Sequence, residues 1–126
     1  MNACLVVFLG AGLGGVLRHL MNAWITRLVG LEYPVGILAI NVIGSSAMGL
    51  LAGWFAFQGQ AAQELRLFLT TGVLGGFTTF SAFSLDAALL YERGQPWFAA
   101  AYVAASVLLS IGGLFAALWG MRIWSS

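Results

Sequence analysis

The segment GGFTTFSAFS at residues 75–84 places hydroxyl groups and phenyl rings in an otherwise strongly apolar stretch of the chain. Its phenylalanines recur at every third position, at Phe77, Phe80 and Phe83. In a helix this spacing keeps the rings on one side, and the electropositive edge of a ring can face an anion without trapping it. The hydroxyls of Thr79 and Ser81 add hydrogen-bond donors nearby. Phenylalanines in apolar segments ordinarily serve packing, so contact with an anion is one of two open interpretations.

The same segment carries residues that weaken a helix. Gly75 and Gly76 stand at its start and weaken a helix there. Neighbouring hydroxyls, such as that of Thr78, can satisfy the backbone groups that a break would free. Non-helical backbone within a membrane occurs only where it is buried in protein or lines a cavity. Freed carbonyl oxygens can coordinate a small cation such as Na+. The residues therefore predict a helix that is broken here, beside a cavity or a buried cation.

Polar side chains also interrupt the other apolar stretches. Asn41 has Ser45 one helical turn further on, and its carboxamide needs partners because unsatisfied polar groups in hydrocarbon are costly. It either bonds a neighbouring helix or donates to a bound anion. Near the C-terminus three hydroxyls follow at i, i+4 and i+8, on Tyr102, Ser106 and Ser110. Serines in membrane helices often bond their own i−4 carbonyl, so a polar track and simple packing both stay open. Arg18 either snorkels to the interface or lines an aqueous vestibule.

The elements that must position these residues follow from composition. The chain has 126 residues, of which 61% are hydrophobic and 7% are charged, far less charge than in a soluble domain. Four stretches reach the roughly 20 apolar residues of a membrane-spanning helix, at about 3–28, 35–57, 65–91 and 97–123. We therefore predict an all-α integral membrane protein with four transmembrane helices in a single domain over residues 1–126. The net charge of +1 gives no reason to expect nucleic-acid binding.

The arginines give almost no instruction about orientation. Four spans place both termini and the middle connection on one side, with Arg66 and Arg122, and leave Arg27 and Arg93 on the other. Orientation follows the imbalance of Lys and Arg between the two sides, and here the counts are equal. Either other features select one orientation, or copies insert both ways and pair antiparallel. Glycine pairs at small-xxx-small spacing suit close helix approach, which favours an antiparallel dimer.

Three motifs carry a resemblance to a known family. GVLGGFTTFSAFS at 72–84, NVIGS at 41–45 and GGVLRH at 14–19 closely resemble the small bacterial fluoride channels of the Fluc/CrcB family, and the likeness covers essentially the whole chain. The resemblance implies a dual-topology, antiparallel homodimer in the bacterial inner membrane, with its third helix broken in mid-membrane. It also implies two pores that passively export cytoplasmic fluoride, and a central structural Na+ at the dimer interface.

The resemblance further implies roles for individual residues. The backbone carbonyls of Gly75 and Thr78 from both subunits would hold Na+. Arg18 matches the vestibule arginine of the family, whereas Asp86 stands where relatives carry glutamate, and its role stays open. The expected pore and fluoride contacts are Asn41, Thr79, Phe80, Ser81, Phe83, Tyr102, Ser106 and Ser110.

Two other classes of membrane protein compete with this interpretation. A small proton-coupled multidrug exporter is also a four-span, dual-topology dimer, but such exporters carry an essential glutamate in the first span, where this chain has no acid. A non-transporting assembly subunit or a lysis protein would explain the size and hydrophobicity, but not the glycine break or the ordered hydroxyls. No nucleophile and base with an orienting third group can be assembled from the sequence, so we do not expect an enzyme.

Overall fold

The computed structural model of the chain describes residues 2–58 and 63–125, so the predicted connection at 59–62 lies outside the described residues. Regular structure within these ranges is helical. The helices are α1 (Ala3–Val29), α2 (Val35–Gln58), α3 (Gln63–Leu67), the π-helix η1 (Phe68–Leu74), α4 (Gly75–Phe77), α5 (Phe80–Glu92) and α6 (Pro96–Ser125).

Four helical stretches are long and apolar enough to cross a membrane, namely Ala3–Val29, Val35–Ala56, Gln63–Glu92 and Pro96–Trp124. The third of these stretches contains α3, η1, α4 and α5. The coarse prediction of an all-helical chain with four such helices is therefore confirmed for the described residues.

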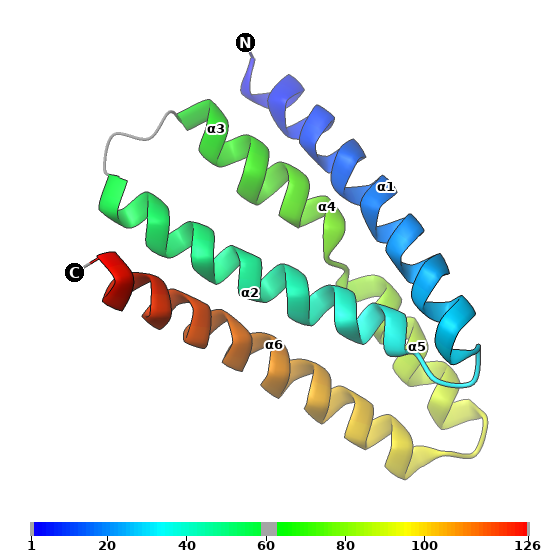
Figure 1. The fold of residues 1–126 in the computed structure, drawn as a ribbon. Helices are drawn as coiled ribbons and strands as arrows, with labels where there is room; N and C mark the ends of the chain where they lie inside the picture. Colours follow the sequence, from blue (N-terminus) through cyan, green and yellow to red (C-terminus); the bar gives the residue numbers. More distant parts are fainter. Residues whose placement is uncertain (1, 59–62, 126) are drawn as a thin grey trace.

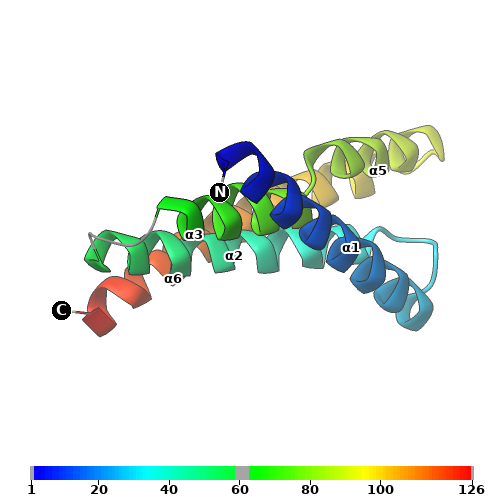
Figure 2. The same cartoon turned by 90° about the horizontal axis from the view of Figure 1, so that it is seen from above.

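The helices form a bundle in which neighbours along the chain alternate in direction (Figure 1). α1 and the stretch from α3 to α5 run one way, and α2 and α6 run the other way, side by side. α1 packs mainly against η1 and α4, whereas α5 packs against α6. Seen from above, α1 and the far end of α5 diverge to opposite sides of the bundle (Figure 2). The change of neighbour between α4 and α5 thus occurs at Thr78 and Thr79.

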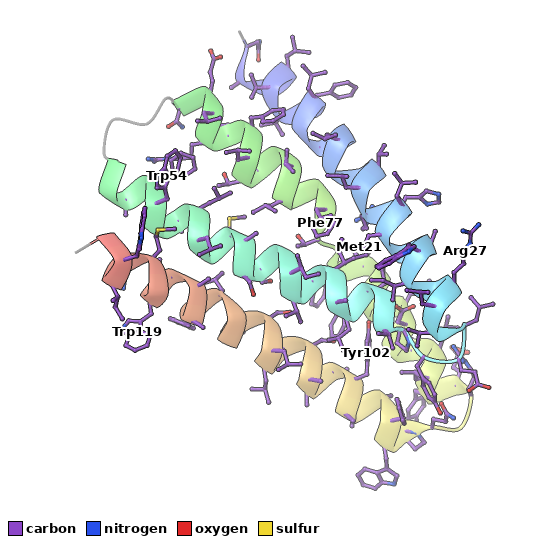
Figure 3. All side chains as sticks on the ribbon, viewed as in Figure 1. Met21, Arg27, Trp54, Phe77, Tyr102 and Trp119 are labelled. Atoms are coloured by element: carbon purple, nitrogen blue, oxygen red, sulfur yellow. The ribbon has the colours of Figure 1, made fainter. Side chains whose placement is uncertain are left out.

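The bundle exposes much of its apolar surface. The buried core is small and includes Ile40, Phe77, Leu90 and Tyr102. Phe77 and Tyr102 are labelled in Figure 3. Large apolar side chains on α6 point outward instead, for example Leu108 with 70% of its surface exposed. A soluble monomer rarely exposes contiguous apolar surface on this scale, whereas a bilayer or a second protein would cover it.

α1 lies against η1 and α4 backbone to backbone, through glycines on both sides. A Cβ atom on Gly14 would overlap the Val73 carbonyl oxygen, and one on Gly76 would overlap the Ala11 carbonyl. Gly10 and Gly72 meet in the same way, because a Cβ on Gly72 would lie 3.0 Å from the Gly10 Cα. Small residues at such positions let membrane helices approach closely, and here that contact lies within one subunit.

This packing gives a matched pair of substitutions. Gly14→Ala is expected to lower the thermal unfolding midpoint in detergent, because overpacking at a tight contact costs about 1–3 kcal/mol. Gly12→Ala places the same methyl group two residues earlier, where nothing lies within 4 Å, and the better helix propensity of alanine should leave the midpoint unchanged or raised. Equal loss of stability in both variants would show that α1 does not pack in this way.

Candidate functional site

A cavity of about 310 Å³ brings together residues from three separate parts of the chain. α2 contributes one wall, the Thr78–Thr79 segment and the start of α5 a second, and the middle of α6 a third. The lining residues are Asn41, Ser45, Thr78, Thr79, Phe80, Phe83, Ser106, Val107, Ser110 and Ile111. Six of the eight residues predicted as pore and fluoride contacts therefore line one cavity, and Ser81 and Tyr102 do not.

The Thr78–Thr79 segment has an extended backbone. α4 ends at Phe77 and α5 begins at Phe80, with φ and ψ of −83° and 158° at Thr78 and of −152° and 124° at Thr79. The Thr79 hydroxyl accepts a hydrogen bond of 3.1 Å from the Ala82 N–H, which caps α5. A threonine at this position thus begins a new helix at the edge of the cavity.

Asn41 holds the backbone of Thr79 at both polar ends. Its Nδ2 donates to the Thr79 carbonyl at 2.9 Å, and its Oδ1 accepts from the Thr79 N–H at 2.8 Å. These two bonds satisfy backbone groups that the extended conformation has removed from the helical ladder. One Nδ2 hydrogen remains for another acceptor. Asn41 therefore bonds a neighbouring helical stretch, which was one of its two open interpretations, and acts as a clamp on the extended segment.

The extended segment also frees two carbonyl oxygens. In a continuous α-helix the Thr79 N–H would bond the Gly75 carbonyl, and the Ala82 N–H would bond the Thr78 carbonyl. Both of these donors are instead bonded to side-chain oxygens. Gly75 is exposed, and the Thr78 carbonyl receives a long contact of 3.4 Å from Nη1 of Arg18. Unwound carbonyls at a helix C-terminus suit Na+, so the residues present fit the implied ion.

The two helix ends at this segment have opposite polarity. The C-terminal end of α4 carries a partial negative charge, which suits a cation at the freed carbonyls. The N-terminal end of α5 carries a partial positive charge, which suits an anion in the cavity. Among residues 2–58 and 63–125, no group of three His, Cys, Asp or Glu side chains is placed to hold a metal. A cation here would therefore depend on backbone oxygens.

Two serine hydroxyls in the α6 wall lack a hydrogen-bond partner of good geometry, although that of Ser106 lies near the Tyr102 side chain. Thr70, Thr78 and Ser84 each bond the carbonyl four residues earlier, at 2.7, 3.0 and 2.9 Å. The hydroxyl oxygens of Ser106 and Ser110 are buried, yet neither has a well-formed hydrogen bond within the described part of the chain. A buried polar group without a partner costs about 1–3 kcal/mol. The cavity thus holds unused donors that a polar occupant would satisfy.

Aromatic rings with electropositive edges also line the site. The centroids of Phe80 and Phe83 lie 5.4 Å apart with their planes tilted by 57°, and Phe83 lies 5.4 Å from the Tyr102 ring. Phe83 is buried, whereas Phe80 is 77% exposed at the edge of the cavity. Tilted rings present electropositive edges, which tolerate an anion.

Some of the predicted residues lie beside the cavity. Ser81 is exposed, with its hydroxyl 3.3 Å from that of Thr79. Tyr102 packs on Phe83 and donates from its hydroxyl to Oδ2 of Asp86 at 3.4 Å. Arg18 is not among the lining residues, and its guanidinium contacts the Thr78 carbonyl, which borders the cavity.

A second, smaller cavity of about 170 Å³ has a polar lining that includes Asn22, Thr26, Tyr33, Asp86 and Arg93. These residues come from the end of α1, the connection to α2, the middle of α5 and the residue that follows α5. They have no shared spacing, so the sequence carried no signal for this cavity.

Comparison with known proteins decides the family. The model of the CrcB-like proteins, described as Camphor Resistance (CrcB), matches residues 5–121. This chain belongs to the CrcB-like protein family. Its motifs at Gly14, Asn41 and Gly72 all lie within the matched region, which confirms the resemblance read from the sequence.

Several curated CrcB-like relatives are similar over most of their length. The fluoride-specific ion channel FluC of Rhodopseudomonas palustris (strain BisB5) is 60% identical over 114 residues, which cover 90% of this chain and 92% of that protein. Fluoride-specific ion channel FluC 2 of Nitrobacter hamburgensis is 58% identical over the same coverage. The fluoride-specific ion channel FluC of Methylobacterium nodulans is 60% identical over 118 residues, or 94% of each chain. None of these three names describes a multidrug exporter.

Proposed function

We propose that this chain is a fluoride-selective ion channel of the bacterial inner membrane. Its relatives that are about 60% identical are named as fluoride-specific channels, and its four apolar helices suit a multi-pass membrane protein. The channel lets cytoplasmic fluoride leave passively, down its own gradient. Hydrogen fluoride enters cells as a neutral weak acid and dissociates inside, so an anion-selective leak discharges it.

The unused donors in the cavity are the observation that carries this proposal. Fluoride is small and strongly hydrated, and it needs several donors in succession to replace its water. The Ser110 hydroxyl, the weakly engaged Ser106 hydroxyl, the remaining Nδ2 hydrogen of Asn41 and the edges of the phenylalanine rings supply them. Among the described residues that line the cavity there is no lysine or arginine. An anion can therefore bind tightly enough to enter and weakly enough to leave.

The proposed assembly is an antiparallel, dual-topology homodimer with two pores. The exposure of Phe80 at the cavity edge supports it, because a ring that contacts permeating fluoride would need a second surface to close the path. We further propose that the extended Thr78–Thr79 segment lies in mid-membrane and that carbonyls of Gly75 and Thr78 from both copies hold a structural Na+. When bound, this ion supplies fixed positive charge between the two copies.

Fluoride efflux from liposomes tests the proposed function. Purified protein is reconstituted with internal fluoride or chloride, and release is followed with ion-selective electrodes. We expect rapid loss of fluoride without loss of chloride. The double variant Ser106→Ala, Ser110→Ala removes only these two hydroxyls and should slow fluoride loss by roughly tenfold, since about 1.4 kcal/mol of barrier corresponds to a factor of ten.

The same assay separates the proposal from its rivals. A proton-coupled exporter would release fluoride no faster than chloride and would respond to a pH gradient. A scaffold or assembly subunit would show no flux in a well-folded state. Equal release of both anions would contradict selectivity for fluoride.

A further inference from the structure

Arg18 reaches the extended segment because of how α1 is packed. Gly14 touches the backbone of Val73 and Phe77, and Arg18 lies one helical turn beyond it on the same face. From there its Nη1 lies 3.4 Å from the Thr78 carbonyl oxygen, across 60 residues of sequence. The close contact at Gly14 thus places the positively charged guanidinium of Arg18 next to the Thr78 carbonyl oxygen.

The contact is a weak one for a charged donor. Charge-assisted hydrogen bonds from arginine are typically about 2.7–2.9 Å long, and 3.4 Å lies well beyond that range. The guanidinium has several further N–H donors in a planar fork, and this carbonyl is the one acceptor that the structure gives it among the described residues. Arg18 is therefore loosely held, in a partly buried position, with most of its donors uncommitted.

The Thr78 carbonyl is also one of the two oxygens proposed above for Na+. Two positive charges directed at one oxygen repel each other, and they do so more strongly in the low dielectric of a membrane protein than in water. We infer that Arg18 and Na+ compete for the Thr78 carbonyl, so that Arg18 gives up this contact when the ion binds. The inference rests on the proposed Na+ site and concerns its regulation.

Displacement of Arg18 would act on the anion path. Thr78 lines the cavity, so a guanidinium that leaves its carbonyl has its free N–H groups beside the cavity that we propose for fluoride. An anion that bonds the released guanidinium favours the ion-bound arrangement, and by linkage the ion favours the anion. Arg18 therefore couples the binding of the structural Na+ to the binding of fluoride in the cavity.

The test measures Na+ binding through stability rather than through transport. Thermal unfolding midpoints of the purified protein in detergent are recorded without fluoride, while N-methyl-D-glucamine replaces Na+ at constant ionic strength. A ligand that binds only the folded state raises the midpoint, and the curve gives a half-saturating Na+ concentration. We expect Arg18→Gln to lower that concentration by about tenfold, because the competing charge is gone.

Two further variants distinguish direct competition from a general effect of charge. Arg27→Gln removes the same charge from the same helix about 14 Å further along and should leave half-saturation unchanged. Arg18→Lys retains the positive charge, so this variant should fold as the wild type does. The lysine side chain is shorter than that of arginine, and its ammonium group lacks the planar, forked donors of a guanidinium. This variant should lower half-saturation in the same direction, by about threefold.

The inference is overturned if neither Arg18 variant lowers half-saturation, or if Arg27→Gln lowers it equally. It is also overturned if the glutamine variant acts and the lysine variant does not, since that would leave only distant charge repulsion. A wild-type midpoint that ignores Na+ would remove the ion site and the inference together. The proposed channel function is tested separately, by fluoride efflux from liposomes that contain the wild-type protein, so the two proposals can fail independently.

Discussion

Replacing Asn41 with leucine is expected to slow fluoride efflux by roughly 100-fold. Leucine has a similar size, but it cannot accept from the Thr79 N–H or donate to the Thr79 carbonyl, which Asn41 bonds at 2.8 and 2.9 Å. Each backbone group left without a partner costs about 1–3 kcal/mol. Together they amount to about 3 kcal/mol, which corresponds to two factors of ten in a rate. The variant also removes the amide donor from the cavity itself.

Ser45→Ala is the matched control for this prediction. Ser45 lies on the same helix and lines the same cavity, one turn beyond Asn41, but the structure gives it no bond to the Thr78–Thr79 segment. Its loss should slow efflux by less than about threefold. Both variants are measured in liposomes with equal amounts of well-folded protein. Comparable rates for Asn41→Leu and Ser45→Ala would mean that the clamp on Thr79 is not needed for conduction.

Phe80→Ile is expected to separate transport from stability. The ring of Phe80 is 77% exposed, so its replacement removes little from the core and should leave the thermal unfolding midpoint unchanged. It does remove the electropositive ring edge beside Phe83, and aromatic edge interactions contribute about 0.5–1.5 kcal/mol. At the upper end of that range, fluoride efflux should fall by about tenfold.

The matched control is Phe8→Ile. Phe8 is 72% exposed on α1, and it lines neither the cavity that contains Phe80 nor the smaller polar one. Isoleucine at this position should leave both efflux and stability unchanged. If Phe80→Ile conducts normally, the ring is not part of the anion path. If it unfolds at a lower temperature than Phe8→Ile, the exposed ring instead serves a packing contact.

Much of the fold follows from the sequence, because four long apolar stretches have few alternatives in a chain with so little charge. Gly75 and Gly76, at which the sequence predicted a break, lie within the helix α4, and the backbone is extended only after them, at Thr78 and Thr79. The π-helix η1 could not be foreseen. Its i→i+5 bonds, such as that from the Gly75 N–H to the Thr70 carbonyl, lie where Gly10 and Gly14 of α1 closely contact this segment. Such contacts leave no periodic signal in the segment itself.

The sequence indicated several of the residues that line the candidate cavity, but not the bonds that they make. Helical spacing placed Ser106 and Ser110 on one side of α6, and the structure puts both in the cavity with Phe83. Helical spacing does not predict that both the Oδ1 and the Nδ2 of Asn41 bond Thr79, because an amide in an apolar helix has many possible partners. The contact between Arg18 and the Thr78 carbonyl is equally hidden, since it depends on the depth at which α1 crosses α4.

The π-helix has a consequence for the length of the chain between α3 and the extended segment. Residues wound with i→i+5 bonds advance around the axis by smaller steps than in an α-helix, where each residue turns by about 100°. The seven residues of η1 therefore set the direction, around the helix axis, in which the backbone of Gly75 and of the following residues is oriented. Deleting one residue there would let the turn relax and swing the Gly75 carbonyl away from its present direction. The number of residues in η1 is therefore tied to the direction in which the Gly75 carbonyl points.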